Sequence, residues 1–238
     1  MLGCSSRFWI EVICGVVIVY MCIILILTAR IQLTHDVPMT MAKLDVDMIR
    51  TGDILVVGYR HVMGMFVTTW SASEWSHTGI AYRDKAGRLW VMEAANYYKP
   101  YIGTFRIPFR DWLNINRKSH LGIVRYRGPK AFPEDALDAA FRVYEGPSGM
   151  KLDTFNLSWH RFLQKEPYTE PFRGVKGPYT CYELTLILLQ TIGVVDRINT
   201  CSSYTPGDIA WGRIHWADGH AYDHVIGWTS DTIRYYSV

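Results

Sequence analysis

The sequence predicts one domain that mixes strands and helices, preceded by a single membrane-spanning helix. Three observations lead to this prediction. Residues 8–27 form an apolar run, residues 76–94 contain two strand-like runs joined by a turn, and residues 184–190 are apolar enough to form a buried helix. The chain has 238 residues, of which 49% are hydrophobic and 20% are charged, so it can bury one sizeable core.

Residues 8–27 predict an uncleaved transmembrane anchor. Their one charged residue is Glu11, and at about 1.5 Å per residue the run spans about 30 Å, the thickness of the hydrocarbon core. A cleaved signal peptide is the alternative, but its apolar region would be unusually long and Thr28-Ala29-Arg30 is a poor cleavage site. We therefore expect a single-pass membrane protein with an anchor at residues 1–29 and a tether at residues 30–44. The flanking charges leave the orientation open.

The folded domain is expected at residues 45–238, and it begins with a turn and a strand. Thr51-Gly52-Asp53 is a turn signal, and the apolar run Ile54–Val57 follows it. The strand-like runs between residues 76 and 94 then predict an antiparallel hairpin.

The second half of the domain is predicted from turn residues and apolar spacing. The expected elements, in chain order, are a covering loop with a short strand at 97–110, a strand at 119–126, a helix at 136–145, a turn followed by a strand at 205–210, and a last strand at 221–228. Residues 147–179 carry four prolines and read as a long irregular segment, which inside a compact domain is more often functional than idle.

Cys181 is the candidate nucleophile. Gly177 and Pro178 mark irregular chain just ahead of it, and the apolar helix behind it has Gly193 as its stop. The unpaired N–H groups and the positive dipole end of a helix N-terminus favour an anion there, and the thiolate is the reactive form of cysteine. The alternative is that Cys181 is a small buried apolar residue, as free cysteines usually are.

Composition excludes several other classes of function. A net charge of +3 without a lysine–arginine run argues against nucleic-acid binding. Three of the five cysteines lie in the first 22 residues, which leaves only Cys181 and Cys201 in the domain. These two do not make a disulfide framework, and no C-x-x-C metal motif is present. A single Cys181–Cys201 bridge stays open as an alternative, and it would silence the thiol.

His77 is the candidate base, because a nucleophilic cysteine needs a base beside it and a group that orients that base. It begins the first hairpin strand, and Gly79 next to it permits close approach of other groups. With a tight hairpin turn, Glu93 lies beside His77 or one diagonal step away. A slip of one residue would turn Glu93 to the opposite face. On its own, a strand histidine is more often structural.

A rival cluster of ionisable residues lies near the C-terminus. Its spacing is not the i, i+4 histidine pair of a zinc-binding helix, and Gly219 within it indicates a loop. We therefore expect a polar loop, with no metal and no cofactor, although one of its histidines could line the site. Its members are His215, Asp218, His220, Asp223 and His224.

Five motifs together resemble the circularly permuted NlpC/P60 papain-like cysteine hydrolases, in particular the YaeF/YiiX-type and poxviral members. In order they are Arg50-Thr51-Gly52-Asp53-Ile54-Leu55, Trp75-Ser76-His77-Thr78-Gly79-Ile80, Val91-Met92-Glu93-Ala94, Thr180-Cys181-Tyr182-Glu183-Leu184 and Thr205-Pro206-Gly207-Asp208. The histidine strand precedes the cysteine helix, whereas the unpermuted relatives have the reverse order. The resemblance implies an α+β fold in which an antiparallel sheet packs on the helix that bears the cysteine. Tyr182 departs from the pattern, which has a small residue after the cysteine.

The residues and the resemblance together predict a membrane-anchored cysteine hydrolase of the papain-like thiol class. Cys181 would be the nucleophile, with its backbone N–H directed at the oxyanion. His77 would be the general base and acid, and Glu93 would orient it. The expected partner is a membrane lipid or a lipid-linked or peptide substrate with an amide, thioester or ester bond. Two alternatives stay open: an acyltransferase that takes a fatty acyl group from phospholipid, as lecithin–retinol acyltransferase-like relatives do, and a non-catalytic membrane-tethered binding module.

Overall fold

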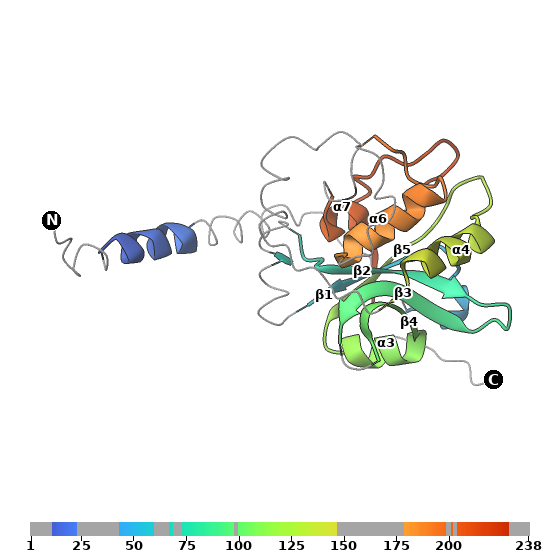
Figure 1. Ribbon diagram of the computed structural model, residues 1–238, viewed down its shortest axis with the longest axis horizontal. Coiled ribbons are helices and arrows are strands. Elements are labelled where there is room, and N and C mark those ends of the chain that lie inside the picture. The colour runs from blue at the N-terminus through green and yellow to red at the C-terminus, as the bar shows by residue number, and fades with distance from the viewer. Residues whose placement is uncertain are drawn as a thin grey trace.

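A six-stranded antiparallel sheet organises the domain (Figure 1). The computed structural model describes residues 11–22, 43–59, 67–68, 73–97, 100–146, 179–198, 201 and 204–228. The strands are β1 (Ile54–Gly58), β2 (His77–Arg83), β3 (Leu89–Asn96), β4 (Ile102–Pro108), β5 (His120–Val124) and β6 (Ile226–Trp228). Their spatial order is β4-β3-β2-β1-β5-β6, and every neighbouring pair is antiparallel. The predicted α+β class is confirmed, as is the pairing of β2 with β3.

Helices cover both faces of this sheet (Figure 1). On one face α6 (Cys181–Thr191) contacts β2 and β3, and α4 (Glu134–Tyr144) contacts α6. On the other face α3 (Phe109–Asn116) contacts β3 and β4. Strand side chains alternate between the two, so Ile54 and Ile80 join the cluster under α6, while Leu55 and Ala81 join the cluster under α3.

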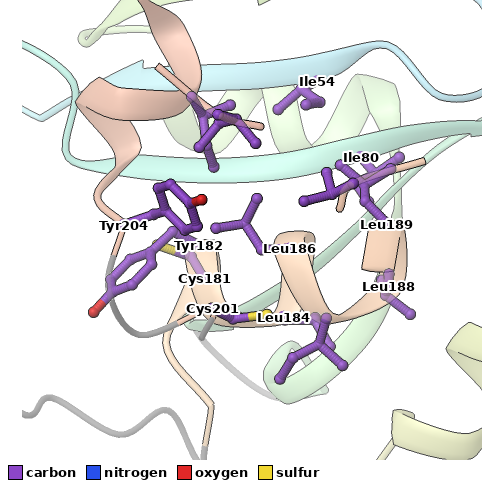
Figure 2. Packing of buried hydrophobic residues seen from close by; sticks show 14 of the residues in the cluster. Ile54, Ile80, Cys181, Tyr182, Leu184, Leu186, Leu188, Leu189, Cys201 and Tyr204 are labelled. Atoms are coloured by element: carbon purple, nitrogen blue, oxygen red, sulfur yellow. The ribbon is translucent and has the colours of Figure 1, made fainter. Parts of the chain in front are cut away.

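The helix α6 begins at Cys181, the candidate nucleophile, because a reciprocal capping box closes its N-terminus. The Thr180 side chain accepts a hydrogen bond from the Glu183 N–H, and the Glu183 carboxylate accepts one from the Thr180 N–H. The apolar residues that follow are buried, and Gly193 adopts a left-handed conformation with φ +75° just after the last turn. The predicted start and stop of this helix agree with the structure. In Figure 2, Leu186 and Leu189 lie between this helix and the strands, and Leu184 and Leu188 lie on the side of the helix away from the strands.

Residues 102–110 are more regular than the covering loop with a short strand expected at 97–110. They form β4, which pairs with β3 along its whole length, and the start of α3. Phe105 and Ile107 point into the core, and Pro108 closes the strand. Because β4 lies at the edge of the sheet, Pro108 does not remove a ladder hydrogen bond to a further strand.

The strand expected at residues 205–210 is wrong, because these residues form the short helix α7 (Pro206–Ala210). The Thr205 side chain accepts a hydrogen bond from the Asp208 N–H, and the Asp208 carboxylate accepts one from the Thr205 N–H. Pro206 stands in the first turn, where its missing N–H costs nothing. The Pro-Gly-Asp motif therefore starts a helix and not a strand.

The N-terminal segment is described only in part. Residues 11–22 are helical, and their apolar side chains are exposed. Among the described residues, no helix has both the length and the apolar character needed to cross a membrane. The flanking parts of the predicted 8–27 span lie outside the described residues, as does most of the irregular segment 147–179. The anchor at 1–29, the tether at 30–44 and the domain boundary at residue 45 stay predictions.

Candidate active site

The β2–β3 hairpin brings His77 and Glu93 to one face of the sheet. Its register pairs Ile80 with Met92 and Arg83 with Leu89, so by continuation Gly79 stands opposite Glu93 and His77 lies one diagonal step away. A Cβ atom at Gly79 would lie 3.3 Å from the Glu93 Cβ and only 2.7 Å from the Val91 Cγ1. The absence of a side chain at Gly79 therefore leaves the room through which Glu93 reaches His77.

His77 and Glu93 form a buried pair at this point. The distance from His77 Nε2 to Glu93 Oε2 is 2.6 Å, and the exposed fractions of the two side chains are 3% and 0%. With Nε2 held by the carboxylate, Nδ1 is the ring nitrogen left for a second partner. Separating two such groups would leave a buried charge without a partner, so the pair is expected to behave as one unit.

Cys181 supplies the second partner of His77. The Cys181 side chain lies near enough to the His77 ring to raise the pKa of this histidine. A threonine pair fixes this approach: the hydroxyls of Thr78 on β2 and Thr185 on α6 are 3.1 Å apart, and Thr185 donates to the Cys181 carbonyl at 3.0 Å. The first residues of β2 and the first turn of α6 are thereby held together.

The surroundings of His77 favour its protonated form. Burial by itself lowers the pKa of His77, but the acidic groups of Tyr59, Cys181 and Glu93 outweigh burial and raise this pKa well above 6.5. Burial also raises the pKa of Tyr59, so its hydroxyl is uncharged at neutral pH. Among these groups, Glu93 contacts the His77 ring directly, at 2.6 Å.

Three aromatic side chains complete the site, and none of them was expected there from the sequence. The Tyr97 hydroxyl lies 3.3 Å from His77 Nε2, and it donates to Glu93 Oε2 at 3.2 Å. The hydroxyls of Tyr59 and Tyr97 are 3.1 Å apart, and the Trp112 indole donates to Glu93 Oε2 at 3.1 Å. Burial raises the pKa of Tyr97 well above 10, so it stays a donor at neutral pH. Of these three residues, only Tyr97 lies in the segment 97–110 that was expected to cover the site.

Tyr182, where the family pattern has a small residue, belongs to the core. It is 3% exposed and packs in the cluster beneath the sheet, in the same view as Tyr204 (Figure 2). Cys201 is also buried, and it and Cys181 are both free cysteines. The alternative of a Cys181–Cys201 disulfide is therefore wrong.

The histidine-rich segment near the C-terminus is a polar loop paired with the end of β5. His220 Nδ1 lies 2.7 Å from the Tyr126 hydroxyl, and Asp223 forms an ion pair with Arg127 at 2.6 Å. Burial, with the nearby Lys130, lowers the pKa of His220. Within the described ranges, no group of three or more His, Cys, Asp or Glu side chains is placed to hold a metal ion.

Comparison with known proteins gives a likeness of fold. No family model matches the chain, and no curated protein matches it in sequence. Among solved structures it is similar to the metalloprotein YiiX from Escherichia coli O157:H7, with 16% identity and a TM-score of 0.44, over 62% of this chain and 69% of that one. The sequence motifs resemble proteins of the YiiX type, and this structure carries that name. At this level the likeness concerns the fold, and the chemistry must follow from the geometry of the site.

Proposed function

We propose that the protein is a cysteine hydrolase that works through an acyl-enzyme on Cys181. The single observation that supports this most strongly is the chain of three buried groups, in which the Cys181 thiol contacts His77 and Glu93 holds the other side of the same ring at 2.6 Å. A nucleophile beside a base, and a group that orients the base, are what thiol catalysis requires.

In the proposed reaction the proton of Cys181 rests on His77 Nδ1, which leaves an imidazolium beside a thiolate, and the thiolate sulfur attacks the carbonyl carbon of the substrate. The carbonyl electrons move onto oxygen, where the backbone N–H of Cys181 can donate to them, because a residue at the start of a helix has no intrahelical acceptor for its N–H. When the tetrahedral intermediate collapses, His77 returns the proton to the leaving amine, alcohol or thiol. Water, deprotonated by the same ring, then releases the acid from the thioester.

Mass spectrometry of the trapped acyl-enzyme tests this proposal. The full-length protein is incubated with a membrane-lipid or cell-envelope extract, quenched in acid, and digested. A mass adduct on the peptide that contains Cys181 is expected, and it should be absent when Cys181→Ser is treated in the same way. Addition of an amine or alcohol acceptor separates hydrolase from acyltransferase, since only the latter diverts the acyl group into a new product. An adduct that persists in the serine variant at another residue would overturn the assignment.

We further propose that the substrate is held at a membrane surface by a lipid or acyl chain. The support is the apolar run at residues 8–27, of which residues 11–22 form a helix with exposed apolar side chains. A flexible tether at 30–44 would span roughly 20–25 Å. The domain, and the active site with it, would therefore stay close to the bilayer surface. Confinement of this kind raises the local concentration of a lipid-borne substrate without any new contact.

The membrane proposal is tested with liposomes. Full-length protein and a truncation that lacks residues 1–30 are compared on a long-chain and a short-chain ester with the same scissile bond. The full-length protein should prefer the long chain, and the truncation should lose that preference. Equal preference in both proteins would remove the membrane proposal but leave the hydrolase proposal standing.

A further inference from the structure

The carboxylate of Glu93 is bound unequally through its two oxygens. Oε2 accepts hydrogen bonds from the His77 ring, the Tyr97 hydroxyl and the Trp112 indole, at 2.6, 3.2 and 3.1 Å. Oε1 is buried and has no hydrogen-bond partner among the residues that the structure describes. All the observed donors therefore act on the one oxygen that faces His77.

Trp112 approaches this oxygen from the face of the sheet opposite to α6. It lies on α3, is 0% exposed, and stacks on Phe109 with ring centroids 5.8 Å apart. The Asn116 side chain donates to the Trp112 carbonyl one turn later along the helix, at 2.9 Å. The indole is thus fixed by packing, and its N–H direction is set by α3 and not by the active-site loops.

The neighbouring Trp228 shows that burial alone does not give a tryptophan a hydrogen bond such as the one from Trp112 to Glu93. Trp228 lies in the same cluster, with ring centroids 6.4 Å from those of Trp112, and it is 1% exposed. Its indole N–H has no partner within the described residues. Two tryptophans in one apolar cluster therefore differ in a single respect that bears on the site, which is the bond to Glu93.

We propose that Trp112 is a positioning residue that holds the Glu93 carboxylate in the orientation that directs Oε2 at His77. This inference rests on the proposed cysteine-hydrolase function and adds a residue to it. A glutamate side chain has several rotatable bonds, and its charge must stay aligned with the ring while the proton moves between sulfur, imidazole and leaving group. An indole N–H carries no titratable charge, so it holds the carboxylate equally well on both sides of that transfer.

The test compares Trp112→Phe with the matched control Trp228→Phe. Both substitutions remove an indole from one apolar cluster, so both should lower the melting temperature to a similar degree. We expect kcat/KM on 4-nitrophenyl octanoate to fall roughly tenfold for Trp112→Phe, since a hydrogen bond to a charged group contributes about that factor, and to stay unchanged for Trp228→Phe. Alkylation of Cys181 by iodoacetamide at neutral pH should slow in the first variant alone. Equal behaviour of the two variants would overturn the proposal.

A double-variant cycle with Glu93→Gln distinguishes positioning from a general packing effect. If Trp112 acts through the carboxylate, Trp112→Phe should cost much less activity in the Glu93→Gln background than in the wild type. Fully additive losses would show that Trp112 supports the site by another route. Failure of the parent function is recognised separately, because then Cys181→Ala would retain activity whatever the tryptophans do.

Discussion

A buried cysteine lies near each end of the helix α6, and the two cysteines differ in the side chains that they contact. At its start, Cys181 contacts a charged histidine–glutamate pair. Near its far end, the Cys201 thiol donates to the Gln190 side-chain carbonyl at 2.9 Å, which is a neutral contact. Burial raises the pKa of Cys201 strongly, and the charge of Glu183 adds to this.

Burial therefore does not distinguish the candidate nucleophile from the second buried cysteine of this protein. Cys181 is 3% exposed and Cys201 is 9% exposed, so the candidate nucleophile is the more deeply buried of the two. The difference is that a thiolate at Cys181 has an imidazolium beside it, whereas a thiolate at Cys201 would face an amide oxygen and a carboxylate charge.

Substitution of the two cysteines should give the largest difference. Cys181→Ala is expected to lower kcat by at least about a thousandfold, as removal of a catalytic nucleophile does. Cys201→Ala should leave kcat within a factor of about two and lower stability by about 1 kcal/mol, because the hydrogen bond from the Cys201 thiol to the Gln190 side-chain carbonyl is lost. Steady-state kinetics and urea denaturation of both variants measure this. Comparable activity in the two variants would show that Cys181 and Cys201 do not differ in their catalytic role.

His77→Ala should be almost as damaging as loss of the thiol. Nucleophile and base act as one unit, so their losses are not additive. The double variant Cys181→Ala/His77→Ala is expected to be no slower than the Cys181→Ala single variant. His220→Ala serves as the control, since that ring bonds to Tyr126 in the C-terminal loop. A double variant much slower than either single one would count against the pairing.

Labelling by iodoacetamide should separate the two thiols under native conditions. The raised pKa of Cys201 means that it stays protonated at neutral pH, and alkylation requires the thiolate. Cys181 is expected to react more than about 100-fold faster at pH 7. In urea both cysteines should react alike, which is the control for intrinsic reactivity. Preferential native labelling of Cys201 would contradict the assignment.

Glu93→Gln should have a smaller effect on activity, because a glutamine can still orient one tautomer of the ring. A loss of roughly 10- to 100-fold in kcat/KM is expected, the range for one hydrogen bond to a charged group. Cys201→Ala serves as the control, and its kcat/KM should stay close to that of the wild type.

The same variant should change how stability depends on pH. The folded pKa of His77 lies well above its unfolded value of about 6.5. The stability that this raised pKa contributes is therefore fully present below about pH 6.5 and is lost as pH rises through the folded pKa. The difference in unfolding free energy between wild type and Glu93→Gln should accordingly be largest at acidic pH and shrink on the alkaline side. A difference that grows with pH would show that His77 is neutral in the folded protein.

The local features of this protein could be predicted from its sequence. Turn residues between two β-rich runs define the hairpin, and the Gly-Pro break ahead of an apolar run places Cys181 at a helix start, because these signals act between residues close along the chain. Candidate roles for Cys181, His77 and Glu93 followed from residue type and order. Of the alternatives for the hairpin register, the sequence could only say that Glu93 would be beside His77, diagonal to it or on the opposite face.

Only the tertiary structure decided which of those alternatives holds and what surrounds the pair. Thr78 and Thr185 meet across 107 positions of the chain, and this contact, which no local signal encodes, sets α6 against β2. Residues 109–116 form α3, whose packing aims the Trp112 N–H at Glu93, and Tyr97 turns back onto the same oxygen. Such contacts depend on how faces of separate elements come together, so a pattern read along one element carries no information about them.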